Sequence, residues 1–305
     1  LEGLRVWDPT FGMPSVWISA GQRGEAEKLG AMIFDPVSVI ATQVTETIRR
    51  YAFEMLDYEI VFKILEEVRK YSPLLVEEIY PKSFTCQEIY EVLYNLLRER
   101  VSIRDMVTIM ESMAHYGSLE IDTDRLTEYV RQSLCHVICR EYKDSENTIY
   151  AITIEERLTG ILASFIKKDH DRKFKLDSLL KEFILNALNE HINTMKDGRL
   201  ISVILCHPQI RLFLRKVTEN FFPDLPVLSY NEIAPGIKVV SAATLSLPDE
   251  MADRYNNKEN LIVSYIEKFQ NDSHPSMRCT AIKMIDSIAD KYDLDKLLTY
   301  LDRGL

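Results

Sequence analysis

The chain has 305 residues, of which 46% are hydrophobic and 28% are charged, so it is long enough for two or more compact units and too apolar for a disordered protein. Its formal charge of −10 argues against nucleic acid or anionic lipid as a partner, because like charges repel. The longest dense apolar run, Leu200 to Cys206, is far shorter than the ~20 residues of a transmembrane helix, so we expect no membrane span in this chain.

The chain begins at Leu1 without an initiator Met or a leader, so we expect an internal piece of a longer gene product. Residues 4–18 read as two extended stretches around a turn at Asp8-Pro9. A short helix that ends at Gly30 is expected next, followed by a strand at residues 32–34.

The apolar period of residues 37–71 predicts two helices that join near Leu56, and Ser72-Pro73 should end the second. Residues 75–84 read as a linker. Thr85 and Glu88 form a capping-box pattern at the start of a helix that runs to Glu99.

A charged hinge is predicted after this helix, with the break at Val101 and Ser102. Ser102 reads as the cap of the following helix, with an acidic side chain three residues later in its first turn. Candidates for subunit contacts or hinge pairs are Arg98, Arg100, Arg104 and Asp105.

The remaining chain alternates between helices and strands. A helix over 122–140 and a strand over 148–154 suggest a winged-helix-like module. The helix 176–195, the buried strand 200–206, the helix 208–221 and the strands 225–228 and 237–243 suggest an α/β unit with a parallel pair. Three short helices are expected between residues 259 and 301, and part of this tail weakly resembles a HEAT-type helix pair.

The chain contains no nucleotide-binding, nucleophile-elbow or zinc-protease motif, so we do not expect an enzyme. Cys135, His136 and Cys139 share one helix, but His136 points away from the two thiols, which favours structural residues over a metal site. His207 follows a buried strand but has no catalytic partner, so a helix-start role is favoured. We expect neither a metal nor a cofactor.

Five strings, in this order, carry a resemblance to a known family. They are VWDPTFGMPSVWI, FDPVSVIATQVTETI, LVEEIYPKSFTCQEIYEVLYNLLRERVSIRDMVTIMES, DRLTEYVRQSL and FPDLPVLSYNEI. The chain resembles the C-terminal cytoplasmic part of the type III secretion export gate family (FlhA/InvA/LcrD), and its flagellar branch in particular.

The resemblance implies an α+β, multidomain fold built from small subdomains. The expected boundaries are residues 1–31 with 81–100 for an incomplete first subdomain, 32–80 for a helical second, 101–175 for a winged-helix-like third, 176–245 for an α/β fourth, and 246–305 for a linker and helical tail of unknown role. Because strands of the first subdomain would be absent from this chain, we expect exposed sheet edges and apolar surface.

The resemblance also implies partners and a location. Proteins of this family have an N-terminal membrane domain in the bacterial inner membrane, and their cytoplasmic part forms a nonameric ring. The ring receives export chaperones with their substrates and works beside the export ATPase, its stalk and other gate subunits, with transport driven largely by the proton motive force.

Family members bind chaperone and substrate in a hydrophobic dimple between the first two subdomains. Matching along YAFEMLDYEI and PKSFTCQEI places this dimple at Phe53, Leu56, Asp57, Thr85 and Gln87. An apolar anchor from a partner helix would dock there.

Two other functions remain open from the residues alone. A generic adaptor would bind its partner through the HEAT-like tail at residues 258–305. A ligand-binding or hydrolytic α/β module would centre on His207.

Overall fold

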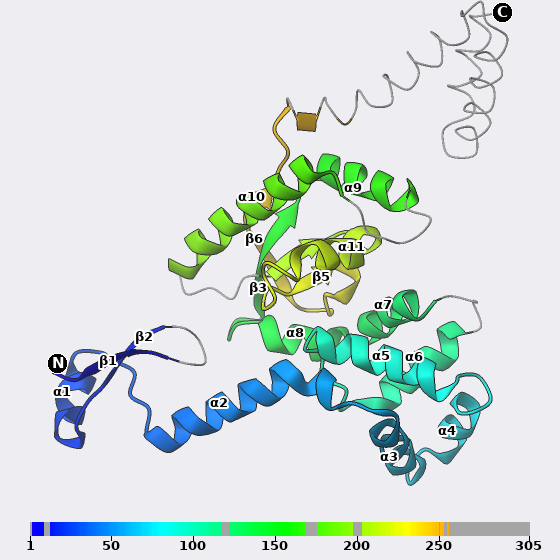
Figure 1. Cartoon of the computed structure of the whole chain (residues 1–305), viewed down its shortest axis with the longest axis horizontal. Helices are drawn as coiled ribbons and strands as arrows, with labels where there is room; N and C mark the ends of the chain where they lie inside the picture. Colours follow the sequence, from blue (N-terminus) through cyan, green and yellow to red (C-terminus); the bar gives the residue numbers. More distant parts are fainter. Residues whose placement is uncertain are drawn as a thin grey trace, which may run out of the picture. The chain divides into compact units, whose positions relative to one another are not determined.

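The computed structural model describes residues 2–8, 13–117, 122–168, 176–197, 203–249, 251–252 and 255 (Figure 1). The helices expected between residues 259 and 301 lie outside these ranges. The chain divides into two compact units, Leu1–Tyr150 with Pro226–Val240, and Ala151–Leu225 with Ser241–Leu305.

The first unit begins with an antiparallel hairpin and continues with helices. Its elements are β1 (Leu4–Trp7), β2 (Pro14–Trp17), η1 (Ala20–Gln22), α1 (Arg23–Lys28), α2 (Pro36–Tyr51), η2 (Ala52–Met55), α3 (Tyr58–Arg69), α4 (Pro73–Ile79), α5 (Cys86–Arg98), α6 (Met106–Gly117), α7 (Thr123–Ser133), α8 (Cys135–Tyr142), β5 (Val227–Ser229) and η3 (Tyr230–Glu232).

Helices α3 to α7 enclose the core of this unit, because each turns an apolar stripe toward its neighbours. Helix α5 packs against α3 and α7, while α6 packs against α4 and α7. The largest completely buried apolar side chains include Leu65, Ile89, Leu93 and Met110. The predicted capping box of α5 is confirmed, since the Thr85 hydroxyl accepts from the Glu88 amide and the Glu88 carboxylate accepts from Thr85 in return.

Three local expectations for this unit are wrong. Residues 32–34 form no strand, and Met32 and Phe34 are exposed. The first half of the expected linker at 75–84 belongs to helix α4, because Pro73 stands at its first position, where proline favours a helix start. The helix expected over 122–140 is two helices, α7 and α8, which change direction at Leu134.

The second unit is built on parallel strands. It contains most of β3 (Thr148–Ile154) and β6 (Lys238–Leu245), together with α9 (Glu156–Lys168), α10 (Ser178–Asp197), β4 (Val203–Cys206) and α11 (Pro208–Thr218). Strands β3 and β4 pair in parallel with Ile152 opposite Ile204, and β6 lies on the other side of β3. All four residues of β4 are buried, as its unbroken apolar sequence predicts.

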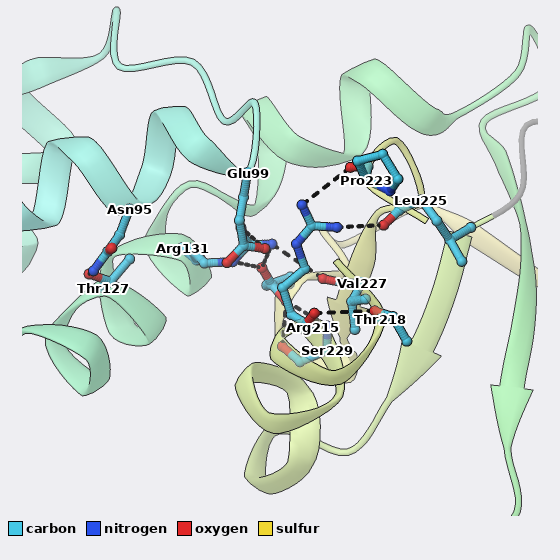
Figure 2. A network of polar contacts seen from close by, with 11 residues as sticks. Asn95, Glu99, Thr127, Arg131, Arg215, Thr218, Pro223, Leu225, Val227 and Ser229 are labelled. Atoms are coloured by element: carbon cyan, nitrogen blue, oxygen red, sulfur yellow. Dashed lines mark hydrogen bonds and ion pairs between the residues drawn. The ribbon is translucent and has the colours of Figure 1, made fainter. Parts of the chain in front are cut away.

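Side-chain hydrogen bonds fix the two ends of α11. His207 caps its start, because the Nδ1 atom accepts from the Gln209 amide at 3.2 Å, which confirms the helix-start role. Near its other end, the buried Arg215 donates to the carbonyls of Leu225 at 3.0 Å and Pro223 at 3.3 Å (Figure 2). No helix within the described ranges combines the length and hydrophobicity that a bilayer crossing requires.

Helix α2 has no buried residue along its length, although it is strongly amphipathic. Val37, Ile40, Val44 and Ile48 follow one another at helical spacing and are 51–74% exposed. The β1–β2 hairpin is exposed as well, with Trp7 at 73%. Exposed apolar surface is therefore present, as the resemblance leads us to expect, whereas the incomplete first subdomain and the subdomain boundaries stay predictions.

Because the apolar side chains of α2 are exposed and those of the core are buried, truncating them should change the free energy of unfolding by different amounts. Leu65→Ala should lower the free energy of unfolding of the first unit by about 2–5 kcal/mol, because it leaves a cavity in a packed core. Val44→Ala should change it by less than about 0.5 kcal/mol, because this side chain is already half exposed. Urea unfolding followed by circular dichroism measures both. Equal losses would show that α2 is buried in solution.

Candidate functional site: an aromatic docking surface

Four aromatic rings from η2, α3 and α5 form a continuous row. The Phe53 ring meets Tyr94 edge-on with centroids 5.6 Å apart, and Tyr94 stacks on Tyr90 at 5.7 Å. Tyr90 in turn contacts Tyr58 at 5.0 Å in a tilted arrangement. We call these four side chains the aromatic row. Such ring pairs stabilise their contact beyond the apolar area that they bury.

Helical spacing places the row on the surface of the first unit. Tyr90 and Tyr94 are four residues apart on α5, so they share one face of that helix. Ile89 and Leu93 lie on another face and are completely buried in the core. The core contacts of α5 therefore fix which way its tyrosines point.

The row is partly open to solvent. Tyr58 is 54% exposed and the nearby Met55 is 61% exposed, while Phe53, Tyr90 and Tyr94 are half-buried. An exposed group of large apolar side chains of this kind is typical of a surface that binds another protein.

The structure places the five residues expected at the dimple in two short segments beside this row. Phe53 belongs to the row itself. Leu56 is only 7% exposed and therefore belongs to the core. Asp57 caps α3, because its carboxylate accepts from the Ile60 amide at 2.7 Å. Thr85 caps α5, and the exposed Gln87 donates to Glu91 at 3.0 Å.

Sequence reasoning missed the three tyrosines that make up most of the row. Tyr90 and Tyr94 carried a usable signal, since they stand four residues apart on a helix whose apolar core positions are already filled by aliphatic residues. Tyr58 gave no such signal, because its contact with Tyr90 joins two helices.

The charged hinge after α5 is a left-handed helix end. Arg100 has a φ of 59°, its amide donates to the Leu97 carbonyl at 2.9 Å, and the Val101 amide donates to the Leu96 carbonyl at 2.9 Å. These two bonds define a Schellman motif. The predicted break at Val101 is confirmed, although a residue with a side chain stands where glycine is usual.

The other residues proposed for the hinge have different surroundings. Ser102 is not the cap of the next helix; Asp105 takes that role, accepting from the Thr108 amide at 3.2 Å and its hydroxyl at 2.8 Å. Arg98 and Arg104 are exposed, and Arg100 is half-buried. Their role in subunit contacts stays a prediction.

Glu99, which lies between Arg98 and Arg100 in the sequence, belongs to a buried ion network. Glu99 follows the last residue of α5, and its carboxylate accepts from the Arg131 guanidinium of α7 at 3.2 Å (Figure 2). Arg131 also donates to Glu232 at 2.6 Å. The side chains of Arg131 and Glu232 are 2% and 1% exposed, so each charge depends on the other for compensation.

The remaining atoms of Glu232 are bonded as well. Its second carboxylate oxygen accepts from the amide and hydroxyl of Ser229. The Cys139 thiol donates to the Glu232 carbonyl at 3.2 Å and accepts from the Ala234 amide at 3.3 Å. Burial raises the pKa of this thiol. Cys139 is thus a structural residue, and the described part of the chain contains no group of side chains suited to a metal ion.

Comparison with known proteins places the chain in context. A family model described as the FHIPEP family matches residues 1–238. Flagellar biosynthesis protein FlhA of Bacillus subtilis is 33% identical over 248 residues, which cover 81% of this chain and 37% of FlhA. The chain therefore spans little more than a third of the length of this relative.

Solved structures share the fold. The Chlamydia pneumoniae CdsV protein is 27% identical, with a TM-score of 0.67 over 77% of this chain and 68% of that chain. A nonameric SctV-C structure from EPEC has a TM-score of 0.66 at 22% identity, covering 80% of this chain and 74% of that chain. These likenesses confirm the α+β, multidomain fold class.

Removing one charge from the buried network should strongly destabilise the first unit. Arg131→Ala is expected to lower its free energy of unfolding by about 3–5 kcal/mol, because the change leaves a buried carboxylate uncompensated. Lys63→Met, which breaks the exposed pair between Lys63 and Glu59, is the control and should cause no measurable loss. Thermal and urea unfolding measure both variants. Similar stability of Arg131→Ala and the wild type would contradict a structural role for the network.

Proposed function

The chain belongs to the FHIPEP family, and we propose that it is the cytoplasmic part of a flagellar type III protein export gate, which docks chaperone–substrate complexes and passes substrates to the membrane channel. The observation that carries this proposal is the 33% identity to FlhA over 81% of the chain. The described residues include a partly exposed row of aromatic side chains, which suits a docking role.

The aromatic row is the surface that we assign to docking. It adjoins the segments that carry Phe53, Asp57 and Gln87, which the family resemblance assigns to chaperone and substrate binding. An exposed ring with fixed neighbours loses little conformational entropy on binding, so a row of rings suits the apolar anchor of a partner helix.

Leu56 supports this surface from below. Because only 7% of the residue is exposed, it contributes to docking by holding η2 and the start of α3 in place. Leu56→Asp would bury a charge and disturb the fold, so it cannot separate binding from stability. Exposed members of the surface give a cleaner test.

The ring is the second part of the proposal. A related fold forms a nonamer in the EPEC SctV-C structure, and we propose the same assembly for the complete protein at the bacterial inner membrane. The exposed Arg98 and Arg104 are the proposed subunit contacts. Several copies of one weak site on a ring raise the effective concentration of partners such as chaperones, the export ATPase and its stalk.

A single exposed tyrosine tests the docking surface. Tyr58→Ser should weaken the binding of a purified export chaperone–substrate complex from the same organism by about tenfold or more, because an aromatic anchor in an interface contributes strongly to affinity. Isothermal titration calorimetry measures the dissociation constant.

Tyr71→Ser is the matched control, because Tyr71 is 64% exposed and lies beyond the far end of α3 from Tyr58. This variant should bind as the wild type does. Equal affinity of Tyr58→Ser and Tyr71→Ser would show that the aromatic row is not the docking surface. Absence of binding by the wild-type chain would contradict the proposed function.

A further inference from the structure

The segment that follows β6 returns to the start of α9. The Glu155 amide donates to the Leu245 carbonyl at 3.0 Å, and the Glu155 carboxylate accepts from the Leu247 amide at 3.1 Å. Glu155 therefore holds the chain at two points just before α9 begins. Slightly further on, Asp249 forms an ion pair with Arg157 in the first turn of the helix, at 2.7 Å.

A tyrosine continues this contact along the helix. The Tyr255 ring meets the Phe165 ring with centroids 6.1 Å apart and planes at 67°. Phe165 stands eight residues after Arg157, a distance of about 12 Å along an α-helix. Between the two contacts the chain makes a turn, in which the Ala252 amide donates to the Pro248 carbonyl at 2.9 Å. The segment thus follows α9 over its first two turns.

The side chains of this segment are buried, which is not typical of a linker. Leu247 is 5% exposed, Ala252 is 0% exposed and Tyr255 is 7% exposed. We call Leu247, Asp249, Ala252 and Tyr255 the clasp. The clasp lies after residues 1–238, which the family model matches, so the family match does not account for it.

From these contacts we infer that the clasp is a docking segment for the chain's own helix α9, and that it fixes the start of the C-terminal tail, residues 256–305, on the second unit. A tail that begins at a fixed point samples a smaller volume than one on a free linker. A partner that the tail binds is therefore held near α9 at a raised effective concentration. This inference does not depend on the proposed export function.

The aromatic contact should carry most of the clasp. The Asp249 side chain is 92% exposed, so its ion pair with Arg157 contributes little. Tyr255, by contrast, withdraws a large ring from water and places it against Phe165. Helix α9 itself does not depend on this ring, because Leu162 and its neighbours already hold the helix in the core. Removing the ring should open the clasp and leave α9 folded.

Limited proteolysis of the full chain measures this opening. Trypsin cleaves after Arg254, directly before Tyr255 in the sequence, and cleavage requires an open segment. Tyr255→Ser should accelerate this cleavage about tenfold or more, because it raises the population of the open form. Short peptides with and without the substitution correct for the preference of trypsin. Hydrogen exchange of the amides around Phe165 should also become faster.

Phe221→Ser is the matched control. Phe221 is an aromatic residue of the same unit that is 55% exposed, and its ring contacts Lys181 of α10. This variant should be cleaved after Arg254 at the wild-type rate.

A double variant shows whether the two rings act through one contact. Phe165→Leu should also accelerate cleavage after Arg254, and its combination with Tyr255→Ser should be no faster than the faster single variant, because both changes remove the same contact. If Phe165→Leu unfolds the unit, cleavage appears throughout the chain and Tyr255→Ser decides alone.

Three results would overturn the inference. They are cleavage of the wild-type chain after Arg254 as fast as that of the free peptide, equal corrected rates for the wild type and Tyr255→Ser, and multiplied effects in a folded double variant.

Discussion

Arg131 lies buried between Glu99 and Glu232, and the arrangement of the first unit depends on this contact. A guanidinium and two carboxylates withdrawn from water are tolerated only when their hydrogen bonds are satisfied. Here the Ser229 amide and hydroxyl complete the bonds of Glu232. The requirement fixes three segments at once, namely the end of α5, helix α7 and the turn η3.

The same helix that ends in this network also carries two tyrosines of the proposed docking surface. The left-handed end of α5 at Arg100 positions Glu99 for the network, while Ile89 and Leu93 hold the inner face of the helix in the core. Tyr90 and Tyr94 therefore stand on a helix that is fixed along its length and at its end. A rigid support of this kind suits a surface that receives a partner, because little order has to be gained on binding.

The exposed apolar residues fall into two groups with different meanings. The aromatic row is supported by core helices and combines the exposed Tyr58 with half-buried rings, which suits the proposed site for a transient partner. The stripe on α2 and the β1–β2 hairpin have exposed apolar side chains without a comparable support. A two-stranded hairpin is marginally stable by itself, so these elements are expected to gain most from a further covering surface.

The sequence by itself determined those features that depend on neighbours within about four residues. The capping box at Thr85, the break at Val101 and the helix start at His207 follow from local hydrogen bonds, and the buried strand β4 follows from its unbroken apolar run. The five family strings also indicated the family, which the family model and the relatives confirm; the two site segments that the resemblance implies stay a prediction. Tertiary structure decided the rest, because Arg131 meets Glu232 across 101 residues and Tyr58 meets Tyr90 between two helices. Neither contact can be predicted from the periodicity of the sequence. Each residue fits the sequence pattern of its own helix or turn, whether or not the other residue is present.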